Sequence, residues 1–555
     1  MKKLPTGIET YEVLAKECYY VDKTEFIEKI DAFPTTSAIL ITRPRRFGKS
    51  TALSMVKCFY EKGEYYSEDI FDDTYIKRKG GAIWKQRGRY PVIYLNFKNL
   101  SPLNFEDLKK ELGDALRLEY ARHPEIKAIP LDASDSDYIN KVESNSLDHI
   151  DLGHGLSNLI RFLECAHSEK VIVIIDEYDG LIQEAASNSE FYDKSIALFK
   201  TFYGTALKGN PRIRFSLLTG VFEIAKDSLT SSLNNPSVYT VLDDGFSKYF
   251  GFTEEETKAF LSYFGYEDKY NDALAWYGGY HFGSSTIINP WSLIRFIANS
   301  CKTGPYWTNT TRKTILSKVL FSSFKNNRSM LLLLKENGGV TCPIDQTITY
   351  QDLEHSETAF ISILTLLGYL TPMTEIDIGV YRLQIPNKEV EIIIQREILS
   401  HYFSAEGFDI LFDFKTALST GDGAKIKSIL EKTILPAINY PGFGSEALYQ
   451  GMILSLLSLT HKEAIIDVEL PSGDGRCDIL VQPKNPNMAG MCIELKHLKG
   501  RTAQNRLSAS ANLALEQIQK TNYEERLRRF GVSKILFYGI SVAQKNIEVV
   551  YRESC

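Results

Sequence analysis

A Gly-Lys-Ser turn between an apolar run and a helical pattern leaves few folds open to the first part of this chain. The run Ala38–Thr42 has the composition of a buried strand, and the residues RPRRFGKS, from Arg43 to Ser50, lead from it into the helical pattern. At such a turn Gly48 lets backbone N–H groups close on phosphate oxygens, Lys49 reaches the β- and γ-phosphates, and Ser50 ligates Mg²⁺. The usual pattern has a glycine at the place of Arg43, so this motif alone is incomplete.

A second motif supplies the other half of a nucleotide site. The apolar run Val171–Ile175 ends in Asp176 and Glu177. Asp176 is suited to hold the Mg²⁺ shell, and Glu177 to orient and deprotonate the attacking water, as phosphoryl transfer requires. Either motif alone is common in structural contexts, but here both occur in order, each at the end of a strand. We therefore interpret them as one P-loop site for ATP and Mg²⁺, with Thr51 among the nucleotide-binding residues.

Two more apolar runs, Val92–Phe97 and Phe215–Thr219, alternate with helical patterns over the first 220 residues. This alternation predicts a parallel sheet wrapped by helices. Thr219 would lie beside the γ-phosphate if its strand lies between the two motif strands, and a hydrogen bond to the backbone is an equally good role for it. The polar segment Leu131–His149 is expected to be a surface insertion.

Several segments of the first half resemble the AAA-ATPase-like family of bacterial proteins. They are YYVDKTEFI (Tyr19–Ile27), LITRPRRFGKST, IIDEYD, LTGVFEIAKDSLTSSLNN and YFGFTEEE, and the resemblance covers roughly residues 5–300. It implies that the arginine at position 43 is a family feature. Whether Arg43, Arg45 and Arg46 hold the phosphates or the neighbouring sheet edge stays open.

The pattern changes at about Gly251. GFTEEETKAFLSYF has a threonine cap, acidic residues in the first turn and an apolar stripe, which predicts a capped helix. The aromatic run Trp276–Gly283 and the helical Ile361–Thr371 then indicate a helical lid followed by a winged-helix-like unit. We expect the aromatic run to pack against the nucleotide domain.

Carboxylates mark the last part of the chain. Period-2 alternation places Glu494 and Lys496 on one face of a strand, and Asp478 lies on the preceding strand. Two such carboxylates can share a divalent metal while the lysine polarises a water for attack on phosphate, although a solvated strand face with an ion pair has the same pattern. The strands are predicted at Ile465–Leu470, Cys477–Gln482, Met491–Leu495 and Lys534–Ile540, with a helix at Gln504–Thr521.

This constellation resembles the PD-(D/E)xK nuclease superfamily over about residues 440–552, with Cys477 at the place of the motif's proline. The resemblance implies a restriction-endonuclease-like α/β fold and a metal-dependent nuclease site. In that site the metal ligands would be Glu446, Asp478 and Glu494, the catalytic lysine Lys496, and the supporting residues near the scissile phosphate Gln517 and Tyr523.

The charge distribution limits how such a domain could hold nucleic acid. The net charge of −6 excludes a chain that coats nucleic acid by bulk electrostatics. The segment Met491–Phe530, however, has eight basic residues against four acids, and it could hold a nucleic-acid backbone or be a solvated helix face. The basic residues are Lys496, Lys499, Arg501, Arg506, Lys520, Arg526, Arg528 and Arg529.

A length of 555 residues predicts three or four domains. We place the AAA-like ATPase domain at residues 1–240, the lid at 241–310, the winged-helix-like middle at 311–435 and the nuclease-like domain at 436–555. With no secretory signal, no apolar run long enough for a membrane and eight scattered cysteines, the cytoplasm is the expected location.

The interpretation we favour is an α/β ATPase whose nucleotide state is coupled to a Mg²⁺-dependent nuclease. The alternative is a nucleotide-switched binding or scaffold protein with an inactive nuclease-like fold. Oligomerisation is left open.

Overall fold

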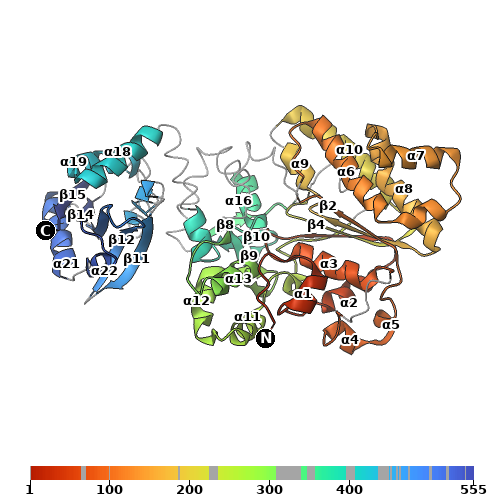
Figure 1. The fold of residues 1–555 in the computed structure, drawn as a ribbon, viewed down its shortest axis with the longest axis horizontal. Helices are drawn as coiled ribbons and strands as arrows, with labels where there is room; N and C mark the ends of the chain where they lie inside the picture. Colours follow the sequence, from red (N-terminus) through yellow and green to blue (C-terminus); the bar gives the residue numbers. More distant parts are fainter. Residues whose placement is uncertain are drawn as a thin grey trace. The chain divides into compact units, whose positions relative to one another are not determined.

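A computed structural model gives the fold (Figure 1). The chain forms two compact units, Met1–Glu391 and Ile392–Cys555. No helix in the described ranges is long and apolar enough to cross a membrane. These ranges are residues 2–63, 70–98, 100–185, 188–223, 236–307, 339–346, 357–394, 407–434, 464–472, 475–498, 503–520, 524–543 and 546–554, with the short stretches 449–450, 453–454, 456–457 and 460–461.

A parallel five-stranded sheet forms the centre of the first unit, as predicted. Its order is β2-β3-β4-β1-β5, and every neighbouring pair is parallel. The carboxyl ends of the strands therefore meet at one edge, and β4 lies between the two motif strands β1 and β3. The strands are β1 (Ser37–Thr42), β2 (Val92–Asn96), β3 (Val171–Asp176), β4 (Ile213–Gly220) and β5 (Ser237–Tyr239).

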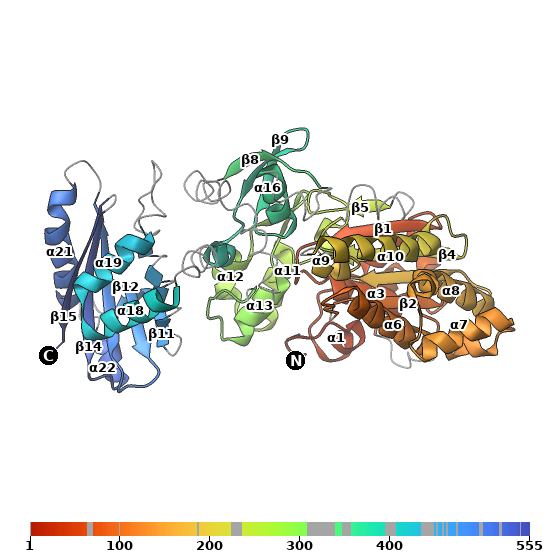
Figure 2. The same ribbon diagram turned by 90° about the horizontal axis from the view of Figure 1, so that it is seen from above.

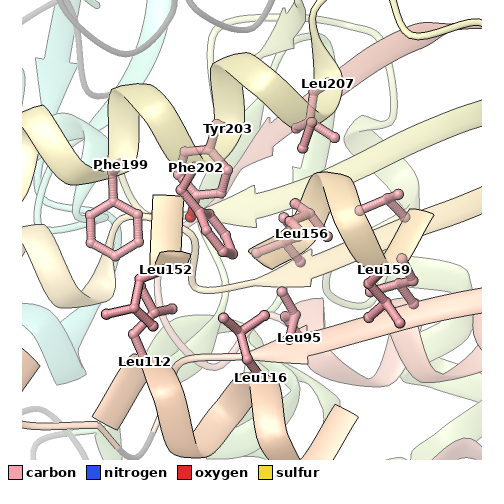
Figure 3. Close-up of a cluster of buried hydrophobic side chains, with 14 of the residues drawn as sticks. Leu95, Leu112, Leu116, Leu152, Leu156, Leu159, Phe199, Phe202, Tyr203 and Leu207 are labelled. Atoms are coloured by element: carbon pink, nitrogen blue, oxygen red, sulfur yellow. The ribbon is translucent and has the colours of Figure 1, made fainter. Parts of the chain in front are cut away.

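Helices cover both faces of this sheet (Figures 1 and 2). On one face, leucines of α6 and α8 meet the aromatic side chains of α10 and Leu95 of β2 in a buried cluster (Figure 3). On the other face α3 contacts β3 and β2, and α1 packs on α3. The bounds are α1 (Tyr11–Glu17), α2 (Glu25–Asp31), α3 (Lys49–Tyr60), α4 (Tyr75–Lys79), α5 (Gly81–Trp84), α6 (Phe105–Ala121), α8 (His149–His167), α9 (Gly180–Ala185) and α10 (Ser189–Leu207).

The polar segment Leu131–His149 contains a helix, α7 (Ala133–Glu143), which the sequence analysis did not predict. The Asp132 side chain caps it by accepting the Asp135 N–H at 2.7 Å. Tyr138, Ile139 and Val142 form a short apolar stripe that is buried in the same cluster as α6 and α8. The segment is therefore part of the core of the unit as well as of its surface.

The segment expected to form the lid, and the expected middle as far as Glu391, complete the first unit, whereas the rest of the expected middle, up to residue 435, belongs to the second unit. A capping box of Thr253 and Glu256 starts α11 at the predicted place. The aromatic run packs on the phosphate loop as expected, because the rings of Tyr280 and Phe282 lie 4.9 and 5.1 Å from Phe47. The lid comprises α11 (Glu254–Tyr263), α12 (Tyr270–Tyr277), β6 (Tyr280–Phe282), β7 (Ser285–Ile287) and α13 (Pro290–Ala298); the middle has α16 (Glu357–Leu366) and a sheet of order β8-β10-β9, with β8 (Val340–Pro343), β9 (Thr371–Asp377) and β10 (Val380–Gln384).

The second unit has a mixed five-stranded sheet of order β11-β12-β13-β14-β15. Only β13 and β14 run parallel. Apolar side chains of α18 and α19 cover one face and those of α21 the other. The strands are β11 (Ala464–Ser472), β12 (Gly475–Pro483), β13 (Gly490–His497), β14 (Ile535–Ala543) and β15 (Asn546–Glu553); the helices are α18 (Gly407–Thr420), α19 (Gly423–Ile434), α21 (Leu507–Lys520) and α22 (Glu525–Arg529).

Candidate nucleotide-binding and nuclease-like sites

The phosphate loop leads from β1 into α3 beside a cavity of about 310 Å³. Gly48 caps α3 with a φ of +87°, in the left-handed region, which is why glycine is favoured at this turn. Gly48, Lys49, Ser50 and Thr51 all line the cavity. The N-terminus of α3 therefore opens on a space where its N–H groups and dipole favour an anion.

Lys49 is held inside the loop. Its Nζ donates to the carbonyl oxygens of Arg43 at 2.8 Å and Pro44 at 3.0 Å. Burial lowers the pKa of Lys49 to about 8, against the opposing charges of Glu177 and Asp176. Because both acceptors are neutral, the ammonium keeps its charge for an anion in the cavity.

Asp176 and Thr219 form a buried pair where β3 and β4 end. The Thr219 hydroxyl donates to Asp176 Oδ1 at 2.7 Å, so it contacts this carboxylate and not the backbone. Asp176 Oδ2 is buried and has no hydrogen-bond partner among the described residues. A buried carboxylate oxygen without a partner is costly, and a bound cation would satisfy it, so the site fits Mg²⁺.

Glu177 faces the same cavity from the other side of the loop. Its φ of +53° places a non-glycine residue in the left-handed region, an arrangement typical of functional sites. The Gly180 N–H, donating to the Glu177 carbonyl at 2.8 Å, closes this turn. Burial raises the pKa of Glu177, while Lys49 and Arg45 oppose the rise, so its carboxylate is a stronger base than an exposed glutamate.

Of the two roles that the sequence left open for Arg43, the structure shows contact with the neighbouring sheet edge. It is fully buried and donates to the carbonyl oxygens of Thr42, Tyr239 and Gly245 at 2.8, 3.0 and 3.3 Å. Its guanidinium lies over the rings of Phe250 and Phe282, and burial lowers its pKa to about 9. Arg43 thus ties the loop to the sheet edge at β5, whereas Arg45 and Arg46 line the cavity.

The sequence analysis missed three residues of this site. Asp179 is buried and accepts the N–H groups of Val221 and Phe222 at 2.9 and 3.0 Å, which fixes the end of β4. It is the last acid of IIDEYD, so the motif itself contained the signal. Glu9 and Lys98 line the cavity, and Lys98 follows β2 at the carboxyl edge of the sheet, where ligands bind in such folds.

The middle of the unit also contacts the loop. The buried Trp307 indole donates to the Arg45 carbonyl at 3.2 Å, and its backbone N–H donates to Glu389 Oε1 at 2.8 Å. Gly368 lies so close to Pro44 that an added Cβ would come within 2.9 Å of its ring. The position of the phosphate loop is therefore set by the segment from Trp307 to Glu389 as well as by the sheet.

A smaller cavity of about 110 Å³ adjoins the first and shares Gly48 and Thr51 with it. Its other walls are mainly apolar and aromatic, with Tyr19, Phe47 and Phe252 among them. An apolar pocket beside a phosphate site suits a planar base.

In the second unit, β12 and β13 bring Asp478, Glu494 and Lys496 together. Asp478 Oδ2 accepts the Leu495 N–H at 2.8 Å, and Glu494 Oε1 accepts from Lys496 Nζ at 3.0 Å. Burial and the charge of Asp478 raise the pKa of Glu494 to about 7. Glu494 Oε2 is buried without a hydrogen-bond partner in the described part of the chain, so this pair of carboxylates also fits a divalent cation.

Of the other residues predicted for the nuclease site, one lies at the site and two lie outside the described residues. Gln517 of α21 reaches the site and donates to Glu494 Oε1. Glu446 and Tyr523 lie outside the described residues, so their roles stay predictions. Gln450, four residues after Glu446 in the sequence, donates to the Asp478 carbonyl at 3.0 Å.

The predicted basic segment is partly neutralised. Arg526 pairs with Asp467 at 2.8 Å, and Arg528 and Arg529 pair with Glu524 and Glu525 one turn away on α22. Lys496 is 34% exposed beside its carboxylate, and Arg506 and Lys520 are exposed. Lys499 and Arg501 lie outside the described residues.

Fold and sites together define a protein with a P-loop domain and an appended nuclease-like domain. Residues 5–230 match the family described as "Predicted AAA-ATPase", and residues 444–552 match the PD-(D/E)XK nuclease superfamily. The chain therefore combines a domain of the AAA-ATPase-like family with one of the PD-(D/E)XK superfamily, as predicted. It is also similar to a protein of Azotobacter chroococcum mcd 1, "Uncharacterized protein in vnfD 5'region", with 26% identity over 410 residues, 72% of this chain and 70% of the relative.

Proposed function

We propose that this protein binds and hydrolyses ATP, and that its nucleotide state is coupled to a metal-dependent nuclease acting on nucleic-acid phosphodiesters. The proposed ATPase activity is supported by one observation: Lys49, Ser50 and Glu177 line the same cavity. The boundaries of the lid, middle and nuclease-like domains given above belong to the same proposal, which leaves oligomerisation open.

The residues of the first site divide the work of phosphoryl transfer. The start of α3 and Lys49 would hold the phosphates, and the apolar cavity beside Thr51 would hold the base. Mg²⁺, held by Ser50 and Asp176, would neutralise charge on the phosphates when bound. Thr219 orients Asp176, and Glu177 accepts the proton of the attacking water.

In the second unit Asp478 and Glu494 would hold the divalent ion, with Glu446 as a third ligand. Mg²⁺ there would act as a Lewis acid on the phosphodiester. Lys496 would stabilise charge that develops on the phosphate, and Gln517 keeps Glu494 in position through its amide. Tyr523 and the exposed basic residues would support the nucleic acid near the scissile phosphate.

The test uses the full chain with labelled single- and double-stranded DNA and RNA, with and without ATP, Mg²⁺ and Mn²⁺. Lys49→Ala should abolish ATP binding. Glu177→Gln should bind ATP but hydrolyse it slowly. Lys57→Ala, on the same helix as Lys49, should bind and hydrolyse ATP as wild type does. Equal ATP affinity of wild type and Lys49→Ala would refute the nucleotide site.

For the nuclease, Asp478→Ala and Glu494→Ala should remove cleavage, and Lys496→Ala should lower its rate while keeping metal binding. Glu548→Ala removes an acid that pairs with Lys427 and serves as the matched control. If wild type cuts and the three variants cut equally well, the site lies elsewhere. If no substrate is cut under any nucleotide condition, the nucleotide-switched scaffold replaces the nuclease.

A further inference from the structure

Three carboxylates, Glu9, Glu177 and Glu184, line the cavity at the phosphate loop, and Glu9 pairs with two of its cations. Glu9, which precedes α1, lines the cavity together with Arg45, Arg46, Lys49 and Lys98. Its Oε1 lies 3.4 Å from an Arg46 guanidinium nitrogen and also accepts from Lys98 Nζ. One carboxylate oxygen therefore bridges two cations in the space beside Lys49 and Ser50.

Arg46 is built into this position and is not a surface side chain. Its φ of +70° lies in the left-handed region, and its guanidinium stacks on Trp291 of α13 at 4.3 Å from the ring centre. Arg295 lies over the same ring at 4.8 Å. The aromatic platform fixes the plane of the Arg46 fork, which suits it to phosphate oxygens.

Lys98 is the second cation that contacts Glu9. It follows β2, whose end lies beside Asp176 because Asn96 pairs with Asp176 in the sheet. Its side chain is 26% exposed, as is that of Arg46, so neither ammonium nor guanidinium is fully solvated. Cations grouped in a partly desolvated cavity need a counter-charge. Glu9 supplies it to Arg46 and Lys98 by direct contact, and Glu177 adds its charge near Lys49 and Arg46.

We propose that Glu9 takes the place of the terminal phosphate in the nucleotide-free protein, and that Arg46 and Lys98 are binding residues for that phosphate. This inference rests on the proposed ATP site and deepens it. A nucleotide must displace the Glu9 carboxylate from both cations, and only a phosphate chain long enough to reach them gains their charge in exchange. Binding therefore favours ATP over AMP, and the competing Glu9 carboxylate lowers the affinity for ATP.

The test is calorimetric titration of the full chain with a non-hydrolysable ATP analogue and with AMP. Glu9→Gln keeps the size of the side chain and removes the charge, so affinity for the analogue should rise about tenfold while AMP affinity stays constant. Lys98→Met should lower affinity for the analogue by about tenfold, again with little change for AMP. Glu12→Gln, an equal change of charge on an exposed helix position paired with Lys16, should change neither.

Two results would overturn the inference while leaving the ATP site intact. One is a Glu9→Gln protein that binds the analogue as wild type does or more weakly, because Glu9 would then be no competitor of phosphate. The other is a Lys98→Met protein with wild-type affinity for the analogue, which gives an answer even if Glu9→Gln fails to fold. Lys49→Ala reports on the site itself, so unchanged analogue binding in that variant would refute the proposed function separately.

Discussion

Glu389 provides a sharp test of how the phosphate loop is held. It is fully buried, Oε1 accepts the Trp307 N–H, and Oε2 is buried with no partner among the described residues. Burial raises the pKa of Glu389 from its ordinary value of 4.5 to about 7. The perturbation is Glu389→Gln, which keeps an oxygen for Trp307 and cannot ionise.

The sign of the effect follows from linkage. Between the unfolded and folded pKa values the folded protein binds more protons, so wild-type stability falls as the pH rises through this window and the loss is complete above the folded value. A displacement of this size amounts to about 2–3 kcal/mol between pH 5 and pH 8. The glutamine variant lacks this loss, so its free energy of unfolding should exceed that of wild type by that much more at pH 8 than at pH 5.

Urea unfolding followed by tryptophan fluorescence measures the right transition. All four tryptophans, Trp84, Trp276, Trp291 and Trp307, lie in the first unit, so the signal excludes unfolding of the second. Glu391→Gln makes the same change of charge at a partly exposed position and controls for the change in net charge. If the free energies of unfolding of wild type and Glu389→Gln change with pH in parallel, the raised pKa of the buried Glu389 carboxyl is refuted.

Three further predictions follow from the sites. Arg43→Gly, which restores the usual glycine of the loop, should lower the free energy of unfolding by about 3–5 kcal/mol, because three hydrogen bonds to carbonyl oxygens and two contacts with aromatic rings are lost. Equal stability of wild type and variant in a urea titration would refute this. ATP should bind roughly tenfold more weakly at pH 9 than at pH 7, because Lys49 loses its proton above about pH 8, and a constant calorimetric affinity would contradict this. If ATP and nucleic acid are coupled, each should change the affinity for the other by the same factor, and two unchanged affinities would mean that the units act independently.

The sheets could be predicted from the sequence because their strands are short, β-branched and apolar. β3 is buried at every position, so its pattern is a continuous apolar run that ends at Asp176. β15 was not predicted, since it alternates between half-buried and buried residues and ends in three exposed ones. The helix α7 was missed because only three of its side chains are apolar and buried, too few to stand out from a polar segment.

The site was predictable where chemistry depends on local order and unpredictable where it depends on distant contacts. Lys49 stands at the start of α3, Asp176 at the end of β3 and Glu494 on β13, so the local sequence pattern was enough to place them. The role of Arg43 depends on carbonyl oxygens almost 200 residues away, at Tyr239 and beyond, which no local pattern reveals. Glu9 and Lys98 likewise meet only in three dimensions.

The anchoring of Arg43 determines how this protein can be divided. Its distant acceptors, Tyr239 and Gly245, and the rings of Phe250 and Phe282 all follow residue 230, where the match to the ATPase family ends. A fragment that ends at residue 230 would lose the acceptors of the Arg43 guanidinium at the sheet edge, and we expect this fragment to be insoluble. A fragment that ends after Glu391 keeps these contacts of Arg43. A fusion that transfers the AAA-ATPase-like domain must therefore include the residues after 230 that anchor Arg43, so the part that folds is longer than the segment that matches the family.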